Sequence, residues 1–173
     1  VIDIDIGLHG SDLRAAERTY QLVRQVSGRA GRTDNKGRAL IQTYQPEHPV
    51  VEAILKGNDE EFWVSEAQQR ELACMPPFGK LVGIIISSSD FERAMSAANQ
   101  LKNNTRALEL IGAKAYGPAP APISRIKRRH RIRFLVKSPR TSELQDAVRK
   151  WVTNVSLKGD LRLSIDIDPQ SFY

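Results

Sequence analysis

The sequence predicts an α/β chain in two parts, an α/β layer followed by a small α+β domain. Over residues 1–46 a helical pattern lies between two segments of alternating apolar residues, which is typical of a strand, a helix and a returning strand. From residue 80 onward, six segments follow in the order β-α-β-β-α-β. Between them, Pro76 and Pro77 disfavour helical geometry in the residues before them. We therefore place the domain boundary after residue 78, which gives the parts 1–78 and 79–173.

The first part opens on a predicted strand in which isoleucines alternate with Asp3 and Asp5. A loop at residues 7–10 then leads into the helix. Functional groups gather at the carboxyl ends of strands in such layers, so Asp5 is a candidate site residue. The alternative is that Asp5 is a solvent-facing side chain on an edge strand.

The helix predicted over residues 11–32 is amphipathic and is capped by Asp12. Its apolar stripe consists of Leu13, Ala16, Tyr20, Val23 and Val26.

The polar end of this helix has the pattern Gln-x-x-Gly-Arg-x-Gly-Arg. Gln25 and Arg29 are four residues apart, and Arg29 and Arg32 are three apart, so a continuing helix places both guanidiniums on one side. Gly28 and Gly31 each cost about 1 kcal/mol relative to alanine in a helix interior, which is tolerated where a ligand approaches the backbone. The planar arginine fork can hold phosphate oxygens bidentately, so the pattern favours a triphosphate site. The alternative is a solvated helix end whose arginines favour the helix dipole.

After this helix we predict a strand at residues 38–46 and helices at residues 50–55 and 60–72, with the sequence KGND between the two helices. Phe62 and Trp63 could stack on bases, but packing in a core is the more common role of adjacent aromatics on an acidic helix.

In the second part we predict strands at residues 80–90, 113–118, 129–138 and 161–169, with helices at residues 91–110 and 141–155. A proline-rich stretch, PAPAP, follows the second strand. This order usually gives an antiparallel sheet with two helices on one face.

Charge differs strongly between the two parts. Residues 1–78 carry 9 basic and 12 acidic residues, whereas residues 79–173 carry 17 basic and 8 acidic, a net charge of +9. Eight basic residues and no acid lie between residues 125 and 140. Such a segment favours contact with a phosphate backbone, and the predicted nucleic-acid-binding residues are Arg125, Lys127, Arg128, Arg129, Arg131, Arg133 and Lys137.

Within the strand at residues 129–138, Arg129, Arg131, Arg133 and Lys137 would share one face while Ile132, Phe134 and Val136 face the core. The alternative is that the charges protect an edge strand against aggregation.

Several classes of protein and site are disfavoured. Cys74 is the single cysteine, which excludes an internal disulfide and a multi-cysteine zinc site. His130 falls on the apolar side of its strand, so we expect a structural role and no metal site. The chain has neither a long apolar run nor the layout of a signal peptide. It opens on Val1 and lacks the phosphate loop and the acidic box that ATP hydrolysis requires, so we expect an inactive fragment of a larger protein.

The sequence QVSGRAGR resembles motif VI of superfamily 2 helicases. The longer run ending in it, together with LIQTYQPEHPVVEAI, RELACMPPFGKL and the terminal IDIDPQSFY, is similar to the primosomal protein N′ (PriA) family of bacterial replication-restart helicases. The resemblance covers the whole chain. It implies that residues 1–78 are the end of the second RecA-like helicase lobe plus a helical linker. It also implies that residues 79–173 form a ribosomal-protein-like domain that binds DNA.

The resemblance further implies an ATP-dependent 3′ to 5′ DNA helicase that restarts stalled forks and loads the primosome, with Mg²⁺ and ATP bound mainly by an upstream lobe. Arg32 would act as the arginine finger, with Arg29 and Gln25 at the γ-phosphate and Gly28, Gly31 and Asp5 beside the nucleotide. Zinc would belong only to the upstream part.

The partners that the resemblance implies are forked or single-stranded DNA, primosome proteins and single-stranded-DNA-binding protein, in the bacterial cytoplasm at the nucleoid. Two alternatives stay open: a stand-alone nucleic-acid-binding module, and a scaffold that docks an acidic protein.

Overall fold

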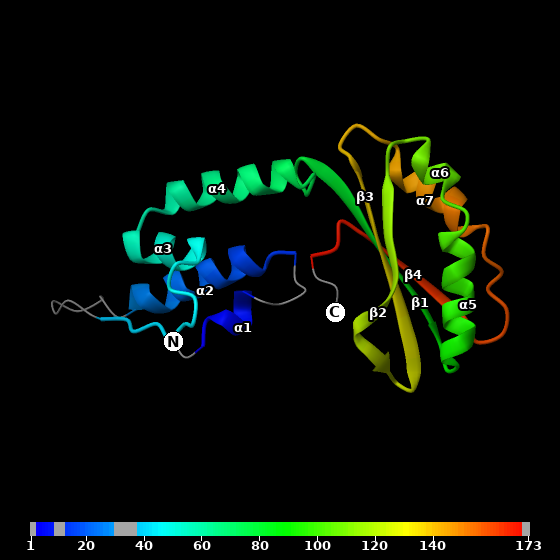
Figure 1. Cartoon of the computed structure of the whole chain (residues 1–173), viewed down its shortest axis with the longest axis horizontal. Helices are drawn as coiled ribbons and strands as arrows, with labels where there is room; N and C mark the ends of the chain where they lie inside the picture. Colours follow the sequence, from blue (N-terminus) through cyan, green and yellow to red (C-terminus); the bar gives the residue numbers. More distant parts are fainter. Residues whose placement is uncertain (1–2, 9–12, 30–37, 171–173) are drawn as a thin grey trace. The chain divides into compact units, whose positions relative to one another are not determined.

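The computed structural model describes residues 3–8, 13–29 and 38–170 (Figure 1). The chain divides into two compact units, residues 1–69 and 70–173. This boundary lies within helix α4 (Asp59–Leu72), upstream of the boundary predicted after residue 78. The end of α4 and the turn after it pack with the second unit, where Lys137 donates a hydrogen bond to the carbonyl of Ala73.

The described part of the first unit contains helices only: α1 (Asp5–Leu8), α2 (Ala15–Arg29), α3 (Pro49–Lys56) and most of α4. Their apolar sides form one small core of Ile4, Tyr20, Val23, Val50, Val51, Ile54 and Phe62.

Both strands predicted in this unit are wrong within the described residues. Residues 5–8 form a helical turn, and residues 38–43 belong to no helix or strand. Ile4 is buried whereas Ile6 is 74% exposed, so the alternation does not place them on one face. The two segments meet through the backbone hydrogen bond from Ile4 to Gln42, 3.1 Å long, and through the Asp5 carboxylate. The RecA-like layer is therefore not seen in the described residues.

The three longer helices confirm the periodicity. Residue Asp12, the predicted cap of α2, lies outside the described residues, as do Gly31 and Arg32. Tyr20 and Val23 are buried, but Val26 is 53% exposed, so the apolar stripe of α2 ends earlier than predicted. Gly57, with a φ of 69°, caps α3 in the left-handed conformation that glycine favours and separates it from α4.

Adjacent aromatics on α4 have the packing role that the sequence favoured. Phe62 is buried and stacks on Tyr20 with ring centroids 3.8 Å apart. Trp63 meets Phe62 edge to face with a centroid distance of 4.9 Å.

The second unit confirms the order β-α-β-β-α-β. Strands β1 (Gly79–Ser88), β2 (Lys114–Ile126), β3 (Arg129–Pro139) and β4 (Arg162–Ile167) form an antiparallel sheet in the order β2-β3-β1-β4. Helices α5 (Phe91–Lys102), α6 (Arg106–Glu109) and α7 (Leu144–Val152) cover one face of it (Figure 1). The helix predicted at 91–110 is thus broken into two.

The proline-rich stretch, predicted outside any strand, is part of β2. Prolines are tolerated there because β2 is an edge strand, whose outer side needs no N–H donors.

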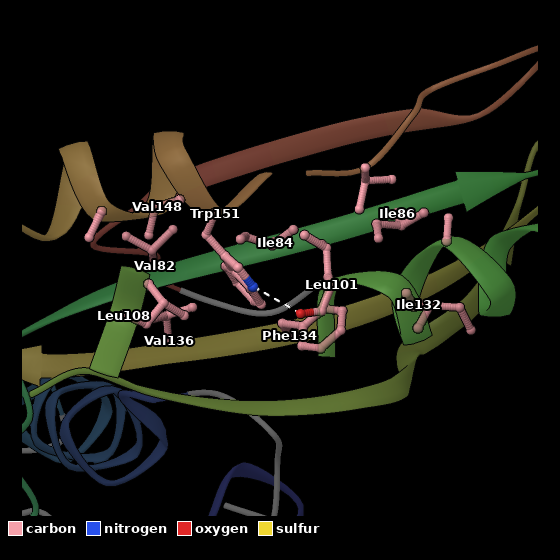
Figure 2. Packing of buried hydrophobic residues seen from close by; sticks show 14 of the residues in the cluster. Val82, Ile84, Ile86, Leu101, Leu108, Ile132, Phe134, Val136, Val148 and Trp151 are labelled. Atoms are coloured by element: carbon pink, nitrogen blue, oxygen red, sulfur yellow. Dashed lines mark hydrogen bonds between the residues drawn. The ribbon is translucent and has the colours of Figure 1, made fainter. Parts of the chain in front are cut away.

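The core of the second unit lies between the sheet and its helices (Figure 2). Trp151 of α7 packs edge to face on Phe134 of β3 at 5.5 Å, and its Nε1 donates a 2.9 Å hydrogen bond to the carbonyl of Leu101 in α5. Ile132 and Val136 also face this core, as predicted. Since strand residues alternate, the odd-numbered residues of β3 face the opposite side of the sheet.

Candidate nucleic-acid interface

The basic strand β3 lies inside the sheet, between β2 and β1. Both of its backbone edges are paired, so its arginines are not needed to protect an exposed edge from aggregation. The edge-strand alternative is therefore wrong. The charged residues of β3 instead project onto the sheet face opposite the helices.

Cross-strand pairing extends this charged surface to the neighbouring strands. Directly paired residues share a face, with Cβ atoms about 5 Å apart. Arg131 pairs with Ser87 of β1, which pairs in turn with Arg162 of β4. Lys137 pairs with Lys114 of β2. We call the surface formed by Lys114, Tyr116, Arg131, Arg133, Lys137 and Arg162 the open face.

The charged members from β2 and β4, Lys114 and Arg162, are absent from the prediction. They are far from the basic segment in sequence, and only the strand register brings them beside it. Asp166 of β4 also falls on this side, because its partner Gly83 pairs with Leu135.

Three further basic residues lie at the tip of the β2–β3 hairpin. Arg125, Lys127 and Arg128 are all exposed. Lys127 and Arg128 form the two-residue connection between the strands and have φ angles of 48° and 61°. Arg125 pairs with His130, so it projects on the helix side of the sheet and is not a member of the open face.

Arg129 is held by the protein itself. Its guanidinium donates to the carbonyl of Ser87 at 2.8 Å and to the carbonyl of Asp160, and it lies 3.5 Å from the Asp160 carboxylate. Its side chain is 18% exposed. A contact of Arg129 with nucleic acid stays a prediction, whereas its structural contacts are evident.

Two other residues predicted to bind nucleic acid, Arg131 and Lys137, have side-chain contacts with strand β2. Arg131 donates a 3.1 Å hydrogen bond to the carbonyl of Ile123 in β2. The Nζ of Lys137 lies 6.0 Å from the centre of the Tyr116 ring.

The predicted nucleotide-contacting residues Gln25, Gly28 and Arg29 lie in the last two turns of α2 and are exposed. A Cβ added to Gly28 would meet no atom within 4 Å, so packing within the described structure does not require glycine there. Arg24, by contrast, points to Asp59, with Nε 2.9 Å from its carboxylate.

Tyr20 also donates its hydroxyl to Asp59. Burial, with the hydrogen bond and the charge of Asp59 added, raises the pKa of Tyr20 to about 12. The contacts of Tyr20 and Arg24 with Asp59 join α2 to α4 within the first unit.

Asp5 is buried, which contradicts the alternative of a solvent-facing side chain on an edge strand. Its carboxylate accepts hydrogen bonds from the Thr43 hydroxyl at 2.6 Å and the Tyr44 amide at 2.7 Å. These bonds hold α1 to the segment before α3. A contact of Asp5 with a nucleotide stays a prediction.

Within the ranges that the structure describes, no three His, Cys, Asp or Glu side chains are grouped so as to hold a metal ion. His130 is half-buried and packs against Phe91 at 5.7 Å. Among the described helices, none combines the length and the apolar character needed to cross a membrane.

Comparison with known proteins gives a family. Residues 71–170 match the model of the primosomal protein N C-terminal domain. The chain is 36% identical over its full length to a replication restart protein PriA of Rickettsia conorii, of which it covers 26%. It is 34% identical over 95% of its length to that of Treponema pallidum, covering 25%, and 31% identical over 98% of its length to that of Bacillus subtilis, covering 21%. The chain thus spans about a quarter of the length of these relatives. It belongs to the family of the primosomal protein N C-terminal domain.

Proposed function

We propose that this chain is the part of a replication-restart DNA helicase that binds DNA through residues 79–173 and contacts ATP through the end of α2. The observation that carries the DNA-binding part is the open face: five cations from three strands share the side of the sheet opposite the helices α5, α6 and α7. Basic side chains on such a surface neutralise phosphates and release counterions. The names of the relatives, which are replication restart proteins, support a role in replication restart.

Binding to DNA is tested by fluorescence anisotropy with labelled fork, duplex and single-stranded oligonucleotides over 50 to 300 mM salt. Because the contacts are ionic, affinity should fall steeply as salt rises. The double variant Arg133→Ala, Arg162→Ala should bind more weakly and with a shallower salt slope. The matched control Lys102→Ala, Lys150→Ala removes two exposed cations from the helices α5 and α7, so its binding should be unchanged.

Salt-independent binding, or none, would overturn the DNA reading. It would favour the alternative in which the cations dock an acidic protein, such as the acidic tail of a single-stranded-DNA-binding protein. Equal weakening by the control pair would mean that the open face has no special role.

The ATP-contacting part rests on the sequence pattern and on the exposure of Gln25 and Arg29 at the end of α2. We propose that Arg32 acts as the arginine finger, with Arg29 and Gln25 at the γ-phosphate, and that residues 1–78 end a RecA-like lobe. ATP and Mg²⁺ would be held mainly by the rest of the protein. An arginine that stabilises a transferring phosphoryl group is worth several powers of ten in rate.

The test is Arg32→Ala in the full-length protein that contains this chain. ATP turnover stimulated by DNA should fall at least a thousandfold, while nucleotide affinity should fall much less. Gln21→Ala, which replaces an exposed glutamine of α2 one turn before Gln25, is the control and should turn over normally. Unchanged turnover in Arg32→Ala would remove the assignment.

We further propose that the intact protein unwinds DNA in the 3′ to 5′ direction at stalled forks in the bacterial nucleoid and engages primosome proteins there. Strand-displacement assays on forks with one labelled arm test the direction. The stand-alone nucleic-acid-binding module would give DNA binding with no effect of Arg32 on turnover.

A further inference from the structure

One aromatic ring lies among the cations of the open face. Tyr116 of β2 is 50% exposed and pairs with Leu135 of β3, on the side opposite the core. On the same face, the paired cations Lys114 and Lys137 lie two residues from Tyr116 and Leu135, in the direction away from the hairpin tip. Arg133 lies two residues from Leu135 in the direction of the tip. An aromatic ring flanked by cations along strands is the arrangement that binds unpaired bases and their phosphates together.

The backbone of β2 holds this ring in place. The register shifts between Tyr116 and Ala119, which marks a bulge, and Gly117 within it has a φ of 129°. A Cβ on Gly117 would lie 2.7 Å from the carbonyl oxygen of Arg133, so glycine is required for the close approach of β2 to β3. Bulges re-aim neighbouring side chains and are common beside functional sites.

A cation lies beside the Tyr116 ring. The Nζ of Lys137 lies 6.0 Å from its centroid, within the range of a cation–π contact. Lys137 is itself anchored by its hydrogen bond to the Ala73 carbonyl. A base stacked on the exposed part of the Tyr116 ring would therefore carry its phosphate to a region that is already positively charged.

We propose that the open face is a binding site for single-stranded nucleic acid in which Tyr116 stacks on an unpaired base while Arg131, Arg133 and Arg162 contact the backbone. This inference rests on the proposed DNA binding and goes beyond it, because it names the side chain that stacks on an unpaired base and the arginines that hold the backbone beside it. Four-stranded sheets of RNA-recognition modules bind single strands through exposed aromatics in the same physical way. A duplex has no unstacked base to offer, so Tyr116 would discriminate against it.

The competing explanation is that Tyr116 only packs against Leu135. Two substitutions separate the explanations. Tyr116→Phe keeps the ring and the packing, and Tyr116→Leu keeps apolar packing but removes the π-face. Tyr44→Leu is the matched control, because Tyr44 is also an exposed tyrosine, 86% exposed, but lies in the other unit.

The experiment measures binding of the 173-residue chain to a labelled 12-nucleotide oligothymidylate and to a 12-base-pair duplex at one salt concentration. Stacking is worth about 1 to 3 kcal/mol per base, so Tyr116→Leu should bind the single strand roughly five- to a hundredfold more weakly. Its duplex affinity should stay within twofold of the parent. Tyr116→Phe and Tyr44→Leu should both bind the single strand normally. A 2-aminopurine base in the oligonucleotide should be quenched by the parent chain and by Tyr116→Phe, but much less by Tyr116→Leu.

Equal affinity of Tyr116→Leu and the parent for the single strand would overturn the inference. So would parallel losses for the single strand and the duplex, or binding of polyglutamate as tight as that of oligothymidylate. If Arg133→Ala, Arg162→Ala still weakens salt-dependent binding in any of these cases, the proposed DNA binding survives and only the stacking role fails. If no nucleic acid binds at all, both fail.

Discussion

At the scale of single residues, Asp160 connects several elements of the second unit. Its carboxylate accepts hydrogen bonds from the Ser88 hydroxyl at 2.8 Å and from the Ser89 amide at 2.6 Å and hydroxyl at 2.7 Å. It also meets Arg93 at 3.3 Å and Arg129 at 3.5 Å. One side chain thus joins the end of β1, the start of α5 and the start of β3 to the segment before β4. The bonds from Ser89 and Ser88, with the charge of Arg129, hold the pKa of Asp160 well below its ordinary value.

This gives a prediction about stability and pH. The charged form of Asp160 is favoured in the folded state, so its contribution is complete above the ordinary pKa of 3.8 and is lost as the pH falls toward the folded pKa. Asp160→Asn should therefore lower the urea midpoint at pH 7 and by the same amount at pH 5. The difference from the parent should shrink below about pH 4.

Circular dichroism during urea titration measures these midpoints. Asp146→Asn is the control, because Asp146 is an exposed acid whose ion pair with Arg149, 3.6 Å long, is also exposed. A difference between Asp160→Asn and the parent that is absent at pH 7, or that grows at pH 3, would contradict the assigned role.

At the scale of elements, the β2–β3 hairpin places charge where backbone geometry favours other residues. Two-residue hairpin turns with positive φ at both positions are dominated by the pair Asn-Gly. Here the turn is Lys127–Arg128, with φ angles of 48° and 61°. The left-handed conformation costs a residue with a Cβ about 1 to 2 kcal/mol. A basic pair at this tip therefore lowers the local stability of the turn, and its two exposed charges fit a role in contacting phosphate.

The double variant Lys127→Asn, Arg128→Gly should separate the two roles. The free energy of unfolding should rise by roughly 1 kcal/mol, because the turn no longer holds two unfavourable residues. Affinity for DNA should fall at the same time, because two exposed charges are lost. Chemical denaturation and anisotropy on the same preparation measure both, and Lys127→Ala, Arg128→Ala, which lowers affinity without relieving the turn, is the control. Lower stability or unchanged affinity in the Asn-Gly variant would contradict this.

At the scale of the whole molecule, each unit has a core of its own in the part that the structure describes. There, the first unit packs four helices around Tyr20 and Phe62. The described residues of the second unit form a core of 17 buried residues between the sheet and its helices. The family model begins at residue 71, close to the boundary between the units at residues 69 and 70.

A shortened chain of residues 70–173 should therefore fold by itself. We expect one cooperative thermal transition and the same salt-dependent affinity for single-stranded DNA as the longer chain, because every residue of the open face is retained. Trp151→Ala in this shortened chain should lower the free energy of unfolding by about 3 to 5 kcal/mol, since it leaves a large cavity. Calorimetry measures the thermal transition of the shortened chain and the change in its free energy of unfolding in Trp151→Ala, and anisotropy measures its affinity for DNA. A non-cooperative transition in the unsubstituted shortened chain would contradict the prediction.

How much the sequence could predict differs between the two units. In the second unit the order of elements follows from patterns that tertiary contacts reinforce: Ile132, Phe134 and Val136 alternate because one face of β3 is covered by helices. In the first unit the alternation of isoleucines predicted a strand, but residues 5–8 form a helical turn. Ile4 is held by a backbone bond to Gln42 and Asp5 is satisfied by Thr43 and Tyr44, contacts over nearly forty residues that no short pattern contains.

The sequence by itself determined that the second part is basic, that its basic strand has one charged and one apolar side, and that residues 25–32 contain a pattern similar to a helicase motif. Only the tertiary structure decided that this strand is an inner one, that Lys114, Tyr116 and Arg162 join its charged side, and that Arg129 is bound to Asp160. The physical reason is that periodicity follows from local backbone geometry, whereas the neighbours of a strand depend on the register between segments far apart in the chain.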